Sequence, residues 1–330
     1  MANKDKAGSQ YLLKITTRMN MQSIKVLSVN ISEAKGTIKK PVAEIELNEL
    51  GVNGDAHSGP WHRQVSLLGT ESFAKFSKEA KREIAYGEFA ENITTEGIVL
   101  YETTPLDRLE IGEVELEITQ IGKKCHGAGC AIYNEVGNCV MPKEGIFARV
   151  LKKGIVKAGD NVVYKPKVYK IHVITLSDRA FKGDYEDRSG PRIIDLARQF
   201  FEEKKNTYNI EHTIIPDDPE ALRVLLDRAE DKKVDVVFTT GGTGIGPRDY
   251  TPEVVRELLD MEIPGIMEAI RMKYGMEKPN ALLSRGVAGV MGKTLVYTLP
   301  GSVKAVNEYM EEILKTLRHL FYMLHGLDAH

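Results

Sequence analysis

Hydrophobic and polar positions follow two different patterns in the two halves of the chain. In the first half, IKVLSVNI over residues 24–31 is a short apolar run, and EVELEITQI over 113–121 alternates apolar with charged residues. A period of two with one charged side predicts a half-buried strand. A third strand is expected from Asn161 to Tyr164, and the one clear helix covers about Thr70 to Ala85. Many short strands with few helices favour a β-rich, barrel-like domain over residues 23–166.

Strands and helices alternate in the second half, over residues 167–330. The predicted strands are Tyr169–Leu176, Ile210–Ile215, Val234–Thr240, Gly286–Val290 and Leu295–Leu299. The predicted helices are Pro191–Lys204, Pro219–Asp231, Pro252–Asp260, Pro264–Tyr274 and a long C-terminal helix that begins at Ser302. This alternation predicts an α/β domain with a mainly parallel sheet flanked by helices.

Two further segments complete the expected organisation. A short basic stretch with a proline, Lys165 to Lys170, lies between the two patterns and puts the domain boundary near residue 167. Residues 1–22 are polar, mixed in charge and without a long apolar run, so we expect a flexible leader and no secretory signal. Met19 and Met21 are alternative start positions within it.

Composition narrows the functional classes. A length of 330 residues suits two domains, and a net charge of -2 gives no global basic field for nucleic acid. No apolar run reaches membrane-spanning length. Three cysteines, an odd number, fit a reducing cytoplasm better than a disulfide framework. We therefore expect a cytoplasmic protein with small-molecule substrates and neither nucleic acid nor membrane as a partner.

The stretch VDVVFTTGGTGIGPRDYTP over residues 234–252 holds the strongest candidate site. A buried strand runs into a loop dense in glycine and threonine, and the next helix is expected to begin with Thr251 as N-cap and Pro252 at its first position. Such a loop brings free N–H groups and a helix dipole to an anion. Arg248 could hold phosphate and Asp249 a metal ion. The alternative is a tight turn without a ligand, which this density of glycine disfavours.

Polar residues follow every predicted strand of the parallel sheet. Ser177, Asp178 and Arg179 come after the first strand, and Asp217 after the second. Because ligands of such sheets lie outside the carboxyl ends of the strands, we expect these loops to converge. The set suits phosphoryl or nucleotidyl transfer, which needs charge neutralisation more than a nucleophile. Alternatives stay open, since Asp178 could merely pair with Arg179.

These motifs resemble the molybdopterin adenylyltransferase family of the Mog/MoaB type, over about residues 170–324. TTGGTG, R-D-x-T-P, S-D-R and L-P-G occur in the family's order. The resemblance implies AMP transfer from Mg-ATP to the terminal phosphate of molybdopterin. It assigns catalysis and magnesium to Asp217 and Asp249. The substrate-binding positions that it implies are Ser177, Asp178, Arg179, Thr240, Gly241, Gly242, Thr243, Gly244, Ser284, Arg285, Pro300, Gly301 and Ser302. Ser284 has a turn residue as its alternative role.

The first half resembles a MOSC domain, the β-rich fold found at the end of molybdenum-cofactor sulfurases. G-x-x-G-D-x-H over 51–57 and R-Q-V-S-L from Arg63 match its opening, and Cys125 lies where the family has its characteristic cysteine. The resemblance implies a site of Cys125, His57 and Arg63 that binds molybdenum cofactor or carries sulfur. Neighbouring cations would lower the pKa of the Cys125 thiol. Structural roles for His57, and zinc binding by the cysteines, are the alternatives.

Together these features predict a molybdenum-cofactor biosynthesis enzyme with ATP and Mg²⁺ as cofactors and molybdopterin as substrate. The alternative is a non-catalytic cofactor-binding, carrier or sulfur-transfer protein. The C-terminal helix has an apolar stripe wider than one sheet face needs, which favours a homo-oligomer. The resemblance implies a trimer or hexamer, with a molybdenum-insertion protein or acceptor molybdoenzymes as further partners.

Overall fold

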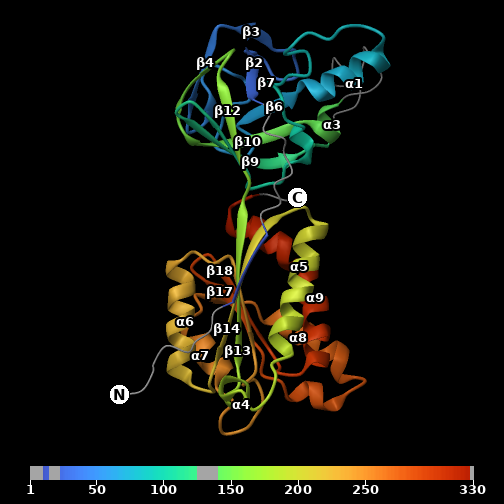
Figure 1. Cartoon of the computed structure of the whole chain (residues 1–330). Helices are drawn as coiled ribbons and strands as arrows, with labels where there is room; N and C mark the ends of the chain where they lie inside the picture. Colours follow the sequence, from blue (N-terminus) through green and yellow to red (C-terminus); the bar gives the residue numbers. More distant parts are fainter. Residues whose placement is uncertain (1–9, 15–22, 125–139, 328–330) are drawn as a thin grey trace. The chain divides into compact units, whose positions relative to one another are not determined.

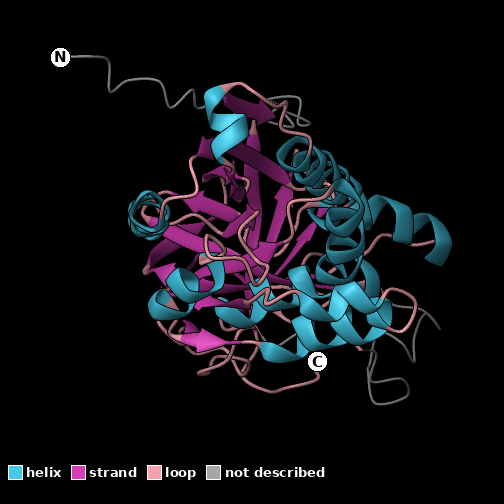
Figure 2. Cartoon of the chain, turned by 90° about the horizontal axis from the view of Figure 1, so that it is seen from below, coloured by secondary structure: helices cyan, strands magenta, loops and turns pink. Residues whose placement is uncertain are grey.

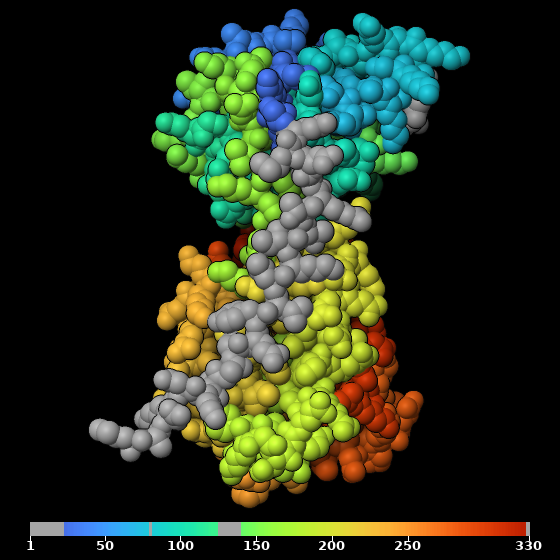
Figure 3. All heavy atoms as spheres, in the orientation of Figure 1, coloured from blue at the N-terminus to red at the C-terminus, as the bar shows by residue number. Residues whose placement is uncertain are grey.

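The computed structural model describes residues 10–14, 23–124 and 140–327 (Figure 1). The chain divides into two compact units, and the main division falls between Lys167 and Val168. Figure 3 shows the atoms packed closely within each of them. The predicted two-domain organisation is confirmed, with strands dominating the first unit and strands and helices alternating in the second.

The N-terminal domain consists mainly of short strands. They are β2 (Ile24–Ile31), β3 (Lys40–Val42), β4 (Glu44–Asn48), β5 (Gly51–Val52), β6 (Val65–Gly69), β7 (Ile93–Glu96), β8 (Arg108–Ile111), β9 (Val114–Ile121), β10 (Ile146–Lys152), β11 (Gly154–Lys157) and β12 (Asn161–Lys165). The helices described here are α1 (Thr70–Ala80), α3 (Met141–Glu144) and the 3-10 turn η1 (Leu100–Glu102). Helix α1 ends before the predicted Ala85, because Lys81 takes a left-handed conformation with φ of 53° at its C-terminus.

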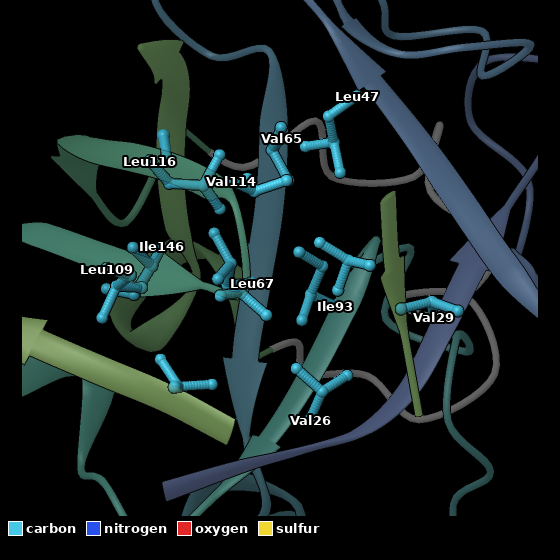
Figure 4. Packing of buried hydrophobic residues seen from close by; sticks show 14 of the residues in the cluster. Val26, Val29, Leu47, Val65, Leu67, Ile93, Leu109, Val114, Leu116 and Ile146 are labelled. Carbon is cyan, nitrogen blue, oxygen red and sulfur yellow. The ribbon is translucent and has the colours of Figure 1, made fainter. Parts of the chain in front are cut away.

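Seven of these strands close into a barrel, in the order β12-β8-β9-β10-β6-β7-β2 with β12 paired back to β2. The pairs are antiparallel except β6 with β7, which the connection through α1 makes parallel. Alternate residues fill the interior, as the strand pattern predicted for Val114, Leu116 and Ile118. Val114 and Leu116 can be followed in Figure 4. Glu117 is also buried, and Arg149 neutralises it at 2.6 Å. Burial of this apolar surface is the main stabilising contribution.

The C-terminal domain alternates strands and helices. Its strands are β1 (Gln10–Lys14), β13 (Val168–Leu176), β14 (Thr207–Ile215), β15 (Val236–Thr240), β16 (Met261–Glu262), β17 (Ala288–Met291) and β18 (Thr294–Leu299). Its helices are α4 (Asp178–Lys182), α5 (Ser189–Glu203), α6 (Pro219–Asp231), α7 (Thr251–Leu258), α8 (Pro264–Gly275), the 3-10 turn η3 (Pro279–Leu283) and α9 (Val303–Leu324).

One seven-stranded sheet forms the centre of this domain, in the order β1-β14-β13-β15-β18-β17-β16. The central strands β14, β13, β15 and β18 are parallel, and the outer strands β1, β17 and β16 each pair antiparallel with their neighbours. Helices α6 and α7 lie on one side of the sheet and α5, α8 and α9 on the other (Figures 1 and 2). Because the helices cover the two faces of the sheet, the edge at the carboxyl ends of the parallel strands is formed by loops.

Two expectations for this domain need correction. The leader expected over residues 1–22 includes strand β1, because the outer edge of β14 offers unpaired backbone groups to an added strand. Thr251 is the first residue of α7 and not its N-cap, which is Tyr250. Among the described residues, we find no helix with both the length and the apolar character needed to cross a bilayer.

Candidate functional site

The strand register brings four loops to one edge of the C-terminal sheet. Leu176 of β13 lies opposite Ile215 of β14, and Thr175 lies opposite Thr240 of β15. Thr240 in turn lies opposite Leu299, the last residue of β18. The loops after all four parallel strands therefore begin at nearly the same level, and the predicted convergence of polar residues follows from this register.

The glycine-rich loop is folded tightly against its neighbours. The Gly241 N–H donates to the Leu299 carbonyl at 3.0 Å, and the Thr251 hydroxyl donates to the Gly241 carbonyl at 3.0 Å. Gly241 and Gly242 have φ values of 107° and 63°. A Cβ at Gly241 would stand 2.3 Å from the Leu176 carbonyl oxygen. Only glycine fits this close approach, so the two glycines shape the loop.

Thr240, a predicted ligand-binding residue, links two loops of the site in this structure. Its side chain is buried, and its hydroxyl donates to the Pro300 carbonyl at 3.0 Å. This bond ties the glycine-rich loop to the turn that opens α9. The residues available to a ligand begin at Gly241.

A pocket of about 470 Å³ opens beside this loop. Most of the predicted binding residues line it, namely Gly241, Gly242, Thr243, Gly244, Asp249, Ser284, Pro300, Gly301 and Ser302. The opposite wall comes from α8, η3 and the start of α9, with Ile270, Arg271, Tyr274, Lys278, Asn280, Ala281, Leu283, Lys304, Ala305, Glu308 and Tyr309. The sequence reasoning missed this second wall, because helix periodicity gives no sign of which helix face returns to the loop.

The second wall combines apolar and charged surface. Lys278 forms an ion pair with Glu308, and its ammonium lies 5.8 Å from the centre of the Tyr274 ring. Tyr309 donates to the Ser284 hydroxyl at 2.8 Å, so Ser284 is held at the pocket wall. A flat ring with a charged substituent matches this combination of aromatic, apolar and cationic groups.

A second group of predicted residues lies at the ends of β13 and β14, outside the pocket lining. The Asp217 N–H donates to Asp178 Oδ1 at 3.1 Å, and Arg248 donates to Asp178 Oδ2 at 2.8 Å. Asp178 therefore pairs with Arg248 and not with its neighbour Arg179, whose guanidinium lies 5.3 Å from the Tyr185 ring centre. Arg248 joins the glycine-rich loop to these carboxylates.

The side chains of Ser177 and Arg285 form hydrogen bonds to other groups of the protein. The Ser177 hydroxyl accepts the Ala180 N–H at 3.2 Å and caps α4. Arg285 donates from Nε to the Gly244 carbonyl at 2.7 Å and forms an ion pair with Glu253. Arg285 is not among the residues that line the pocket.

The two predicted metal ligands come from different loops, Asp249 from the glycine-rich loop and Asp217 from the loop after β14. Asp249 accepts the Gly246 N–H at 2.8 Å and lines the pocket. Burial, together with the charge of Asp217, raises the pKa of Tyr250. Within the described ranges, no three His, Cys, Asp or Glu side chains form a metal cluster. Mg²⁺ commonly binds through one or two carboxylates together with phosphate oxygens, so carboxylates such as these are of the right chemical type for it.

The N-terminal domain has a separate, smaller pocket of about 100 Å³. It is lined by His57, Trp61, Arg63, Ser66, Ala90, Asn92, Lys123, Met141 and Phe147. The Arg63 guanidinium lies 4.7 Å from the Trp61 ring centre, and the Lys123 ammonium lies 5.7 Å from that of Phe147. Two of the three predicted MOSC residues, His57 and Arg63, are thus brought together. The third, Cys125, lies outside the described residues.

Buried charged side chains lie next to His57 of this pocket. Asp55 contacts His57 at 3.3 Å and Lys39 at 2.5 Å, and the side chains of Asp55 and Lys39 are each 1% exposed. Burial alone would raise the pKa of Asp55, but hydrogen bonds from His57 and Lys39 hold it well below its ordinary value. Burial also raises the pKa of Glu91 to about 7. The ionised Asp55 therefore lies beside His57, which lines the pocket together with the cationic side chains of Arg63 and Lys123.

Comparison with known proteins assigns both domains. Residues 172–319 match the family described as probable molybdopterin binding domain, and residues 54–163 match the MOSC domain. Over 160 residues the chain is 39% identical to a molybdopterin adenylyltransferase of Pyrococcus furiosus, and the match covers 47% of this chain and 90% of that protein. The chain belongs to this molybdopterin adenylyltransferase family. A MOSC domain precedes the adenylyltransferase-like domain, as the motifs predicted.

Other relatives differ in how much of their length is matched. Gephyrin of Dictyostelium discoideum is 33% identical over 169 residues, which cover 49% of this chain but only 23% of gephyrin. The solved structure of the tungsten cofactor synthesizing protein MoaB from Pyrococcus furiosus is 37% identical, with 49% of this chain and 98% of that chain covered and a TM-score of 0.43. Membership of the adenylyltransferase family places the C-terminal domain in molybdenum cofactor biosynthesis.

Proposed function

We propose that the C-terminal domain transfers AMP from Mg-ATP to the terminal phosphate of molybdopterin. One observation carries this proposal: the glycine-lined pocket and the paired loops of Asp178 and Asp217 share one sheet edge, joined through Arg248. A transferase for two phosphorylated substrates needs phosphate-binding N–H groups next to carboxylates that can hold Mg²⁺. The name of the matched relatives, molybdopterin adenylyltransferase, supplies the substrate class.

The reaction balances as a nucleotidyl transfer. An oxygen of the molybdopterin phosphate attacks the α-phosphorus of ATP, and a new phosphorus–oxygen bond forms. The bond between the α-phosphorus and the oxygen bridging to the β-phosphorus breaks, and pyrophosphate leaves with that electron pair. No electrons are exchanged, so the protein needs to supply orientation and charge neutralisation alone.

Each part of the edge has a role in this proposal. Backbone N–H groups of residues 241–244 hold phosphate oxygens beside the pocket wall, and Arg248 turns from Asp178 toward the ATP phosphates. Lys278 and Tyr274 face the ring-bearing part of a substrate in the pocket. Asp217 and Asp249 would hold Mg²⁺, which when bound neutralises phosphate charge.

For the N-terminal domain we propose binding of a phosphorylated cofactor in the pocket of His57 and Arg63. A volume of about 100 Å³ and the two cationic side chains of Arg63 and Lys123 match one phosphate group rather than a whole pterin. Sulfur transfer by Cys125 is the second candidate for this domain. The homo-oligomer, its protein partners and the cytoplasmic location stay predictions from sequence.

The test mixes the full-length protein with molybdopterin, ATP and Mg²⁺ and follows pyrophosphate release. We expect release that depends on molybdopterin and that falls at least about 100-fold in Asp249→Asn. Asp195→Asn is the matched control, since Asp195 is an exposed residue of α5 that pairs with Arg198. Molybdopterin binding without pyrophosphate release would instead support a non-catalytic carrier.

A further inference from the structure

Arg285 reaches the glycine-rich loop at both of its ends. Its backbone N–H donates to the Thr243 carbonyl at 3.0 Å, and its Nε donates to the Gly244 carbonyl at 2.7 Å. Its Nη2 donates to the backbone carbonyl of Asp249, and its Nη1 pairs with the Glu253 carboxylate in α7. The side chain therefore connects the middle of the loop at Gly244, the end of the loop at Asp249 and the helix that follows.

These contacts use all three guanidinium nitrogens. The side chain of Arg285 is 32% exposed, and it is absent from the lining of the 470 Å³ pocket. A guanidinium that binds phosphate must turn at least one edge of its fork toward the anion. In this structure both edges face protein acceptors, which are the Gly244 and Asp249 carbonyls and the Glu253 carboxylate.

The held segment includes Asp249 itself. The Asp249 N–H donates to the Gly246 carbonyl at 3.0 Å, and its Oδ2 accepts the Gly246 N–H at 2.8 Å. This small turn sets where the carboxylate points, and Arg285 holds it from outside through the Asp249 and Gly244 carbonyls. If the fork is removed, the turn keeps its internal bonds but loses its fixed position relative to the pocket.

We propose that Arg285 is a positioning residue, which clamps the glycine-rich loop and so fixes the direction of the Asp249 carboxylate. This inference rests on the proposed function, because it concerns how Asp249 is presented to the substrates. It replaces the role of substrate ligand that the sequence predicted for Arg285. A lysine cannot replace the clamp, because an ammonium is a point donor without the planar fork.

Two measurements on the full-length protein test the clamp. The first is hydrogen–deuterium exchange of peptides covering residues 241–251, without substrate, in wild type, Arg285→Ala and Arg285→Lys. We expect exchange about 10-fold faster or more in both variants. Peptides of β13 and β14 should be unchanged, which excludes general unfolding. The second is the kinetics of pyrophosphate release, where we expect kcat about 100-fold lower in both variants and KM for molybdopterin changed less than about threefold.

Arg223→Lys is the matched control. Arg223 is 34% exposed and pairs with Glu257, another glutamate of α7, outside the glycine-rich loop. We expect its loop exchange and kcat within about twofold of wild type.

The possible results separate the two roles. Near-normal activity in Arg285→Lys with a raised molybdopterin KM in Arg285→Ala would overturn the clamp and restore the ligand role. Unchanged loop exchange in both variants would also overturn it. A wild-type protein without pyrophosphate release would reject the proposed function, and the exchange measurement would still decide whether the clamp exists.

Discussion

The two candidate sites of this protein use polar groups in opposite ways. At the C-terminal sheet edge, Arg248 and Asp178 are 72% and 29% exposed, and much of the site is glycine backbone. Behind the N-terminal pocket, Lys39 and Asp55 are each 1% exposed. The Arg248–Asp178 pair of the first site is therefore solvated in the folded protein. The Lys39–Asp55 pair behind the second pocket loses its hydration when the domain folds.

This difference predicts whether a substitution that removes a charge will alter stability or activity. In an exposed pair, solvent screens the interaction and side-chain entropy opposes it, so stability depends little on either partner. In a buried pair, loss of one partner leaves an uncompensated charge in a low-dielectric interior. Substitutions in the N-terminal domain should therefore alter stability, and those at the C-terminal edge should alter activity.

The largest stability effect is expected for Lys39→Met. Asp55 would then lose its cation while remaining buried, at a cost of about 4 kcal/mol in the free energy of unfolding. Urea unfolding followed by the fluorescence of Trp61 measures this, since the chain has a single tryptophan and it lies in this domain. Lys165→Met is the control, because Lys165 pairs with Glu110 at the surface. Equal losses in the two variants would contradict the comparison.

The next largest effect should be the pH dependence of the unfolding free energy of the N-terminal domain. Burial raises the pKa of Glu91 to about 7, so the folded state holds a proton there that the unfolded state releases above about 4.5. The unfolding free energy should fall as pH rises from 4.5 to 7, by about 3 kcal/mol for this group. Glu91→Gln should remove that slope, as measured by Trp61 fluorescence in urea at several pH values. An identical slope in the variant would assign it to other groups.

Asp187 should give the C-terminal domain a pH dependence of stability with the opposite sign, so that the unfolding free energy rises with pH. Burial opposes ionisation, but hydrogen bonds from His212, Thr175 and the start of α5 lower the pKa of Asp187 to about 2. The contribution of Asp187 to the unfolding free energy is complete at pH values above 3.8, the pKa of this group in the unfolded chain. It is lost as the pH falls through the folded-state pKa of about 2. Asp187→Asn should cost about 2 kcal/mol at pH 7 and about half of that at pH 3. Exchange of β14 peptides measures this, and a loss that is constant with pH would contradict it.

Sequence reasoning located the parts of the molecule that depend on local pattern. The glycine-rich loop and the polar residues after each parallel strand were predictable, because a buried strand followed by glycines or carboxylates is a local signal. Partners distant in sequence were not. Arg248 finds Asp178 across 70 residues. Lys39 and Lys40 look alike in the sequence, yet only Lys39 is buried, because Asp55 lies opposite it in the fold. The pocket wall of α8 and α9 was hidden for the same reason.

The smallest stability effect is expected for Arg248→Ala. Its ion pair with Asp178 at 2.8 Å is exposed, so its loss should change the unfolding free energy of the C-terminal domain by less than about 1 kcal/mol. Exchange of β13 peptides at pH 7 measures this on the same scale as Asp187→Asn. If the proposed function holds, the same variant should still release pyrophosphate about 10-fold more slowly, because one phosphate cation is missing. A loss of several kcal/mol would show that Arg248 holds the fold together, and the contrast between an exposed C-terminal site and a buried N-terminal one would then fail.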